Sequence, residues 1–218
     1  MGTAKAHSVL ANGEYVLSPK ISAKSEKWDG GHTYLTISFY DYETEDEFHF
    51  KIKAVVLTHA HFDHVLYVDK WADTIKVPVY IAKEDAPLLR EPENNCSSHM
   101  MSDTSFFVEP TFLDDTLFFG DTSVKIIRTP GHSPGSVCYL FENEKVMFSG
   151  DMLFAGAVGR VDLPMGDAHK MLESIELLKS IDDEVLVYPG HGYYTKMGIE
   201  KKNNPFFLII CAFHNIDG

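Results

Sequence analysis

Apolar and polar positions follow one another in short blocks that predict several strands and one clear helix. Apolar runs typical of strands are separated by Gly, Pro, Asn and Asp turn residues. The predicted strands cover 54–57, 77–81, 123–128, 136–141, 145–148 and 184–187. The clearest helix spans 167–181, because Asp167 is a good N-cap and apolar residues follow it at helical spacing. Residues 83–90 predict a short helix weakened by Pro87, and residues 91–110 a loop with irregular helix.

Strands that alternate with helices place the chain in the mixed α/β class. No shift in composition and no Pro/Ser-rich linker divides the 218 residues, so we expect a single domain over 1–218. Its two ends are atypical. In the N-terminal part, 1–52, segments 33–40 and 48–50 flank the acidic stretch 41–47 and predict a β-hairpin. The C-terminal tail, 207–218, begins with an unusual apolar run.

The net charge of −13 argues against a nucleic-acid partner, because no basic patch is present to neutralise phosphates. The longest apolar run, 206–213, is too short to span a bilayer, and the N-terminus has no apolar leader segment. The three cysteines, Cys96, Cys138 and Cys211, form neither a metal-type spacing nor an even disulfide framework. We therefore expect a cytoplasmic protein with no membrane partner.

The densest chemistry lies directly after the strand predicted at 54–57. Three imidazoles and one carboxylate fall within six residues: His59, His61, Asp63 and His64. These side chains are the ligand types of zinc and its first-row neighbours. Alternation along an extended chain points His59 and His61 the same way, so both can reach one ion, and Asp63 and His64 can reach a second. The alternative is a cluster of ordinary surface histidines.

Three further candidates make that alternative less plausible. His132, Asp151 and His191 each follow an apolar run and a break residue, as His59 does. Ligands placed repeatedly at strand ends converge on one edge of a sheet. The pattern predicts a dinuclear metal site.

With these residues in view, the chain resembles the metallo-β-lactamase superfamily and, within it, the glyoxalase II-like hydrolases. The resemblance runs from about Lys53 to Phe206 and includes every metal motif. It implies an αββα sandwich with the metals at one edge of the two sheets. Asp rather than Cys at position 151 favours the branch that cleaves esters and thioesters over the antibiotic-hydrolysing branch with a cysteine ligand.

The resemblance also implies how the ligands divide. One ion would take His59, His61 and His132. The other would take Asp63, His64 and His191, with Asp151 bridging the two. Both ions are expected to be divalent, most plausibly Zn, with Fe or Mn as alternatives, because His and Asp ligands accept all three.

The expected reaction is hydrolysis of a small thioester or ester by a metal-bridging hydroxide. Paired metals lower the pKa of a shared water and polarise the substrate carbonyl, so no separate Ser or Cys nucleophile is needed. We assign the catalytic roles to Asp151 and to Asp63, which has the further potential to orient the hydroxide. Cys138 lies in a predicted strand and is expected to be a buried apolar residue.

For the substrate, the resemblance implies contacts from Arg160 and Tyr193, which match a basic residue and a tyrosine that meet the glutathione carrier. A structural Arg160–Asp162 ion pair is the alternative for Arg160. The chain stops soon after Phe206, where single-domain relatives end, so glutathione itself is not fixed as the carrier. We expect a monomer or homodimer acting on a small molecule.

Two other functions remain open at this point. One is an oxidoreductase that resembles the persulfide dioxygenases, which use the same fold with one iron. The other is a metal-binding family member with lost or altered activity. Occupancy of the second metal site separates the first alternative from the dinuclear hydrolase.

Overall fold

The computed structural model describes residues 54–100, 102–119 and 122–208, together with four backbone strands in the first forty residues. The chain divides into two compact units, Met1–Lys51 and Ile52–Gly218. The division falls close to the end of the part expected to be atypical, 1–52. The single domain over 1–218 stays a prediction, and the apolar tail beyond residue 208 lies outside the described residues.

The first unit contains two antiparallel strand pairs. β1 (His7–Val9) pairs with β2 (Tyr15–Leu17), and β3 (Ser22–Lys27) pairs with β4 (Thr33–Ser38). The expected strand at 33–40 is thus confirmed over β4, which pairs with β3; its expected partner, 48–50, lies outside the described residues.

The second unit holds two main sheets. The larger has the strand order β15-β14-β11-β10-β9-β8, and the smaller is the parallel sheet β5-β6-β7. The strands of the larger sheet are β8 (Thr116–Phe119), β9 (Thr122–Arg128), β10 (Val137–Phe141), β11 (Val146–Gly150), β14 (Leu186–Pro189) and β15 (Thr195–Lys196). The smaller sheet consists of β5 (Val55–Val56), β6 (Val79–Ile81) and β7 (Thr111–Phe112). A separate ribbon pairs β12 (Leu153–Phe154) with β13 (Ala157–Val158).

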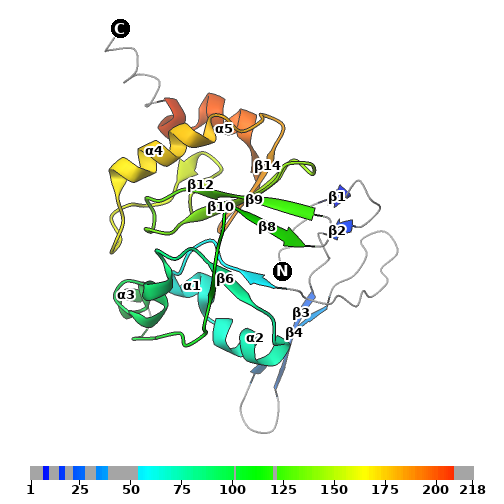
Figure 1. Ribbon diagram of the computed structural model, residues 1–218, viewed down its shortest axis with the longest axis vertical. Coiled ribbons are helices and arrows are strands. Elements are labelled where there is room, and N and C mark those ends of the chain that lie inside the picture. Colours follow the sequence, from blue (N-terminus) through cyan, green and yellow to red (C-terminus); the bar gives the residue numbers. More distant parts are fainter. Residues whose placement is uncertain are drawn as a thin grey trace. The chain divides into compact units, whose positions relative to one another are not determined.

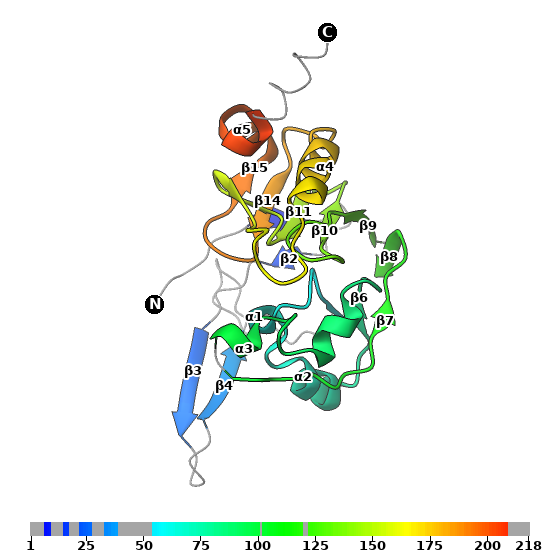
Figure 2. The ribbon, with the colours of Figure 1, turned by 90° about the vertical axis from the view of Figure 1, so that its left-hand side faces the viewer.

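Helices cover the outer side of each sheet (Figures 1 and 2). On the side of the larger sheet lie α4 (Ala168–Leu178) and α5 (Met197–Asn203). On the side of the smaller sheet lie α1 (Phe62–Val65), α2 (Val68–Ile75) and α3 (Ser97–Met100). The expected helix at 83–90 is instead a short 3-10 helix, η1 (Ala86–Arg90), with Pro87 in its first turn, where proline is tolerated.

Strand β10 shows why the layers stack. Its side chains alternate, so Val137 and Tyr139 pack into the cluster shared with β6 and β9, while Cys138 and Leu140 pack beneath α4. A strand buried on both faces is apolar at nearly every position. Separate clusters fill the space between the sheets and the space under each helical layer. This arrangement of helix, sheet, sheet and helix confirms the predicted αββα sandwich.

Helix α4 forms as the sequence predicts. The Asp167 carboxylate accepts hydrogen bonds from the backbone N–H groups of His169 at 2.9 Å and Lys170 at 3.1 Å, which caps the first turn. Met171, Ile175 and Leu178 are buried at spacings of four and three residues. The helix ends at Leu178, three residues earlier than the apolar pattern suggests.

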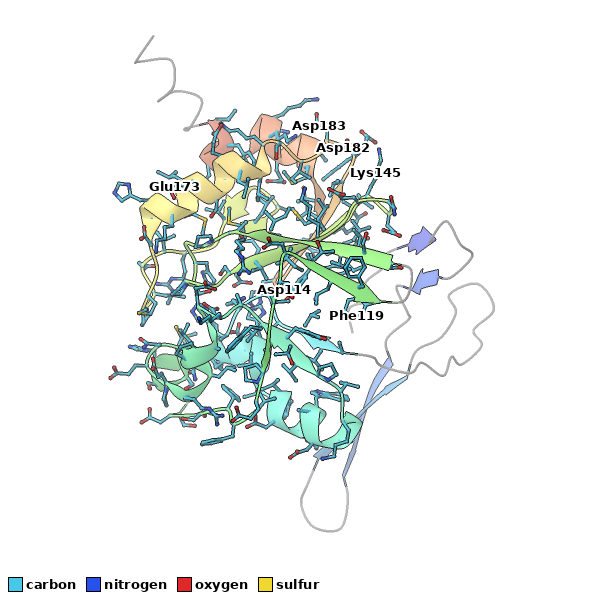
Figure 3. All side chains as sticks on the ribbon, in the orientation of Figure 1. Asp114, Phe119, Lys145, Glu173, Asp182 and Asp183 are labelled. Carbon is cyan, nitrogen blue, oxygen red and sulfur yellow. The ribbon has the colours of Figure 1, made fainter. Side chains whose placement is uncertain are left out.

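The strand directions determine where the functional loops lie. β10 is antiparallel to both β9 and β11, and β11 is parallel to β14, so the carboxyl ends of β9, β11 and β14 meet at one edge. The opposite ends of β11 and β14 are joined by an exposed ion pair between Lys145 and Asp182, 3.1 Å apart (Figure 3). Among the described residues, no helix has the length and apolar character needed to cross a membrane.

Candidate metal centre

The first histidine loop leaves the end of β5 and enters α1. The Thr58 carbonyl accepts a hydrogen bond from the Val137 N–H at 2.9 Å, which ties the loop to β10. His59 and His61 are 1% and 3% exposed, so their rings point into the protein. Asp63 and His64 follow within α1 and are more accessible, because the helix turns them toward the rim.

His132 lies in the loop between β9 and β10 and is 3% exposed. A Cβ on the preceding Gly131 would lie 2.6 Å from the Met171 Cα, so only glycine lets this loop approach α4 so closely. The His132 Nδ1 lies 2.8 Å from the Arg160 carbonyl oxygen. Because a carbonyl can only accept, His132 carries its hydrogen on Nδ1 and presents a lone pair at Nε2.

Asp151 and His191 follow the neighbouring parallel strands β11 and β14. Gly150, at φ +51°, turns the chain before Asp151, and a Cβ there would lie 2.5 Å from Thr58 Oγ1. The Gly190 N–H donates to the Gly150 carbonyl at 2.9 Å, which joins the two loops. The side chains of Asp151 and His191 therefore both lie at the sheet edge that carries His132.

The structure brings all seven predicted ligands together in overlapping groups. In the first group, His59, His61 and His132 offer ligand atoms within 4.8 Å of one another, and all three residues are buried. The closest pair is His61 Nδ1 and His132 Nε2, 2.8 Å apart. This is the set that the resemblance implied for one ion.

The second group contains Asp63, His64 and His191, whose ligand atoms satisfy the same limit. His191 Nε2 lies 3.1 Å from both His64 Nε2 and Asp63 Oδ2. The His191 side chain is 55% exposed, whereas that of His64 is 16% exposed. This group therefore forms the open, solvent-facing half of the centre.

Asp151 lies between the two groups. Its Oδ1 is 3.3 Å from His64 Nε2, and its Oδ2 is 3.6 Å from the Nε2 atoms of both His132 and His191. One carboxylate thus contacts imidazoles from each group. This is the position that a bridging ligand needs.

Three buried polar atoms support a metal-binding role. His59 Nε2, His61 Nε2 and Asp151 Oδ1 have no hydrogen-bond partner among the described residues. An unpaired buried polar atom costs about 1–3 kcal/mol, so native proteins rarely leave several in one place. Imidazole nitrogens and a carboxylate oxygen that face one another fit a divalent cation. The residues present are therefore able to hold two metal ions.

The electrostatics of the centre keep His59 and His61 neutral, which is the form that binds metals. Burial lowers the pKa of His59 well below its usual value and that of His61 to about 4. Burial also lowers the pKa of His64, but the neighbouring Asp151 carboxylate outweighs it and raises that pKa. Burial raises the pKa of Asp151, but the nearby His64 and His132 outweigh it, so its pKa is lowered and it stays ionised.

The two predicted substrate residues are arranged differently. Arg160 donates from Nε and Nη2 to the two carboxylate oxygens of Asp162, both at 2.7 Å, so the structural ion pair is present. Tyr193 follows His191 by two residues and is 86% exposed.

A cavity of about 220 Å³ adjoins Asp63 and His64. Its other walls are apolar and include Leu66, Tyr67 and Trp71 of the α1–α2 segment. The residues that follow the first histidine motif therefore shape a space next to the candidate ligands.

Sequence reasoning missed one buried carboxylate near the centre. Asp85 is fully buried and accepts hydrogen bonds from both histidine loops. Burial raises its pKa, while hydrogen bonds from Ser133 and the Gly135 backbone oppose that effect. The available signal was its place shortly after the strand 77–81, the same position relative to a strand that the ligands occupy. In the sequence Lys83-Glu84-Asp85 it has the appearance of a surface residue.

The cysteines are separate from this chemistry. Cys138 is fully buried in β10, as predicted, and burial raises the pKa of its thiol to about 12. Cys96 is buried and free, and Cys211 lies outside the described residues.

Comparison with known proteins agrees with the fold. The family model described as the metallo-beta-lactamase superfamily matches residues 28–191, so the match begins inside the N-terminal part. The hydroxyacylglutathione hydrolase GloC of Haemophilus influenzae is 32% identical over 166 residues, which cover 74% of this chain and 78% of that protein.

Two solved structures are also similar. The BLEG-1 B3 metallo-beta-lactamase has a TM-score of 0.67 and 38% identity, covering 71% of this chain and 77% of that one. TTHA1623, in a di-iron-bound form, has a TM-score of 0.66 and 29% identity, covering 88% and 97%. With a family model that spans most of its length and the αββα architecture in place, this chain belongs to the metallo-beta-lactamase superfamily.

Proposed function

We propose that this chain is a hydrolase that uses two divalent metal ions to cleave a small thioester or ester. The observation that carries the proposal is the meeting of two ligand groups at one sheet edge, with Asp151 between them. The similarity to a hydroxyacylglutathione hydrolase supports a thioester as the substrate class.

In this proposal His59, His61 and His132 hold one ion and Asp63, His64 and His191 hold the other, with Asp151 shared. Ions bound there would lower the pKa of a water molecule toward neutrality and polarise the acyl carbonyl. Zinc is the first choice. The similarity to a protein solved in a di-iron-bound form supports iron as an alternative. Manganese is a further alternative, because the same His and Asp donors also bind it.

The residues of the chain prepare the centre for this chemistry. Burial keeps His59 and His61 neutral at pH 7, so they need not lose a proton before they bind an ion. The Arg160 carbonyl fixes the Nδ1–H of His132, so the other ring nitrogen faces the centre. Asp63 lies on the accessible side, where it is able to orient an incoming water.

No side-chain nucleophile is required. Cys138, in β10, is fully buried, and burial raises its pKa to about 12, so its thiol stays protonated at neutral pH. A thiolate also leaves readily, so the chain need not supply a strong general acid to the leaving group.

The substrate contacts form part of the proposal. We assign Arg160 and Tyr193 to the rim that meets a carboxylate-bearing thiol carrier, because an Arg fork pairs well with a carboxylate. The cavity beside Asp63 and His64 suits a small apolar acyl or thiol group.

The test pairs metal analysis with a substrate panel. Purified protein is expected to hold two metal ions per chain and to hydrolyse S-lactoylglutathione or a related thioester faster than a lactone, a phosphodiester or a β-lactam. A persulfide tested for oxygen uptake covers the dioxygenase alternative. His59→Ala should lose metal and activity, whereas His169→Ala, on the exposed side of α4, should keep both.

Three results would contradict the proposal. The first is fewer than one metal ion per chain after reconstitution. The second is full hydrolysis by His59→Ala. The third is oxygen-dependent persulfide turnover by a protein that holds only one iron.

A further inference from the structure

The fully buried carboxylate of Asp85 lies outside both candidate ligand groups. It follows β6 and precedes the 3-10 helix η1. β6 is parallel to β5, so the carboxyl end of β6 lies at the same edge as the first histidine loop. A buried carboxylate is costly unless donors surround it.

Three donors do surround it. Oδ2 accepts from the Ala60 N–H at 2.9 Å and from the Ser133 hydroxyl at 2.7 Å, and Oδ1 accepts from the Gly135 N–H at 2.5 Å. Each carboxylate oxygen therefore holds at least one backbone N–H in place.

The identity of these donors matters more than their number. Ala60 lies between His59 and His61, and Ser133 follows His132 directly. Asp85 thus links the two loops that carry the buried three-histidine group. These loops are separated by more than seventy residues in the sequence, and one carboxylate fixes their spacing.

The surroundings of Asp85 are fitted closely to this link. A Cβ on Gly135 would lie 2.6 Å from the Asp85 backbone nitrogen and 2.9 Å from its Oδ1, so only glycine permits the approach. The Ser136 hydroxyl lies 2.7 Å from the Ser133 hydroxyl and accepts the Ser133 N–H at 3.2 Å. The link therefore continues into a small network around the His132 loop.

We propose that Asp85 is a positioning residue for the three-histidine half of the metal centre, holding the His59–His61 and His132 loops at the separation that one ion requires. It touches no candidate ligand side chain in the described contacts and acts through the backbone. The inference rests on the proposed function only in so far as the three-histidine group binds a metal.

Asp85→Asn is the sharpest substitution, because it keeps shape and removes charge. A carboxamide has one acceptor oxygen and one NH₂ group. In either orientation the NH₂ group faces an N–H donor, of Ala60 or of Gly135, so one of the two backbone links is lost. Ser133→Ala is the milder companion, since it removes one hydroxyl donor and leaves both backbone links.

The matched control is Asp69→Asn. Asp69, in α2, also accepts two backbone N–H groups, from Phe107 at 2.8 Å and Val108 at 2.6 Å. Those bonds hold a loop that carries no candidate ligand. If ordinary structural hydrogen bonding were the cause, Co²⁺ binding should weaken in both Asn variants. If ligand positioning is the cause, Co²⁺ binding should weaken only in Asp85→Asn.

The probe is Co²⁺, added to full-length protein that has been stripped with a chelator, in a His191→Ala background that leaves the three-histidine group intact. We expect Asp85→Asn to bind Co²⁺ about 10–100-fold more weakly and to shift its visible absorption bands, as substitutions of residues that orient metal ligands do. The rise in Tm on adding Co²⁺ should shrink as well. Ser133→Ala should show a smaller loss, and Asp69→Asn should keep the affinity and spectrum of its background.

Unchanged Co²⁺ affinity and spectrum in Asp85→Asn would overturn the inference. If that variant does not fold, Ser133→Ala decides: weakened binding supports the positioning role, and unchanged binding refutes it. A native chain that binds Co²⁺ but hydrolyses nothing would remove the proposed reaction and leave the role of Asp85 intact. A native chain that binds no metal would remove both.

Discussion

The Arg160 carbonyl oxygen holds the Nδ1 of His132 at 2.8 Å, while the Arg160 guanidinium turns away to pair with Asp162. One residue thus has two separable parts, a backbone that orients a candidate ligand and a side chain at the rim. Substitution of the side chain alone leaves the first part in place.

Arg160→Ala should therefore keep its metal content, because the carbonyl remains. If Arg160 meets a carboxylate on the substrate, KM for a carboxylate-bearing thioester should rise about tenfold, the scale of one charge-assisted hydrogen bond, while KM for an uncharged ester stays constant. Steady-state kinetics on the two substrates measure the difference. If Arg160→Ala changes KM equally for both substrates, the Arg160–Asp162 ion pair has a purely structural role.

The Arg160–Asp162 pair also predicts a pH effect. The hydrogen bond from Arg160 lowers the pKa of Asp162 from an ordinary 3.8 to about 2. A carboxyl whose pKa is lowered on folding stabilises the protein above its unfolded pKa, and that stabilisation is lost as the pH falls from about 4 to about 2. NMR titration should show the low pKa in the native chain and a value near 4 in Arg160→Ala. Because the pair is exposed, the change in Tm should be small.

Gly190 packs closely against Asp151, the proposed bridging ligand. A Cβ there would lie 2.3 Å from Asp151 Oδ1 and 2.6 Å from His64 Cε1. Gly190→Ala should displace one of these side chains and weaken metal binding about 10–100-fold, as measured by competition with a chelator.

The control for Gly190 is Gly156→Ala, in the turn between β12 and β13. Gly156 has φ +78° and open space around its Cβ position. Alanine there should cost about 1–2 kcal/mol of stability through backbone strain alone and leave metal binding unchanged. Equal metal affinities in the two alanine variants would count against the proposed place of Asp151.

Cys138 should be chemically inert. With its side chain fully buried and its pKa raised to about 12, it should resist iodoacetamide at pH 8 until the protein unfolds. Mass spectrometry of alkylated native and denatured protein measures this directly. Cys138→Ala should keep hydrolysis, at a stability cost of about 1 kcal/mol for the lost buried volume. Loss of hydrolysis with the metal content and fold preserved would instead give the thiol a role in the reaction.

The convergence of the candidate ligands was predictable because it depends on strand ends. Apolar runs followed by Gly and then His or Asp mark the carboxyl ends of β11 and β14, and parallel neighbours bring those ends together. Helix α4 was predictable for a similar local reason, since Asp167 caps it and its apolar face is regular.

Other features depend on contacts that a linear pattern does not carry. Strands such as β7, β12 and β13 have two residues each, too few to show any alternation. The pairing of β4 with β3 required a choice between two possible neighbours. The role of Asp85 depends on its contacts with Ala60 and Gly135, which are distant from it in the sequence and carry no recognisable signal there.

The candidate ligands are contributed by both layers of the sandwich: His59 to His64 from the β5–β7 side, and His132, Asp151 and His191 from the larger sheet. Any fluctuation that separates the layers must therefore pull the ligand groups apart. A bound ion would act as a cross-link between the two halves, so it should slow hydrogen exchange at the seam far more than within either sheet. In this fold the candidate metal centre would also hold the two layers of the sandwich together.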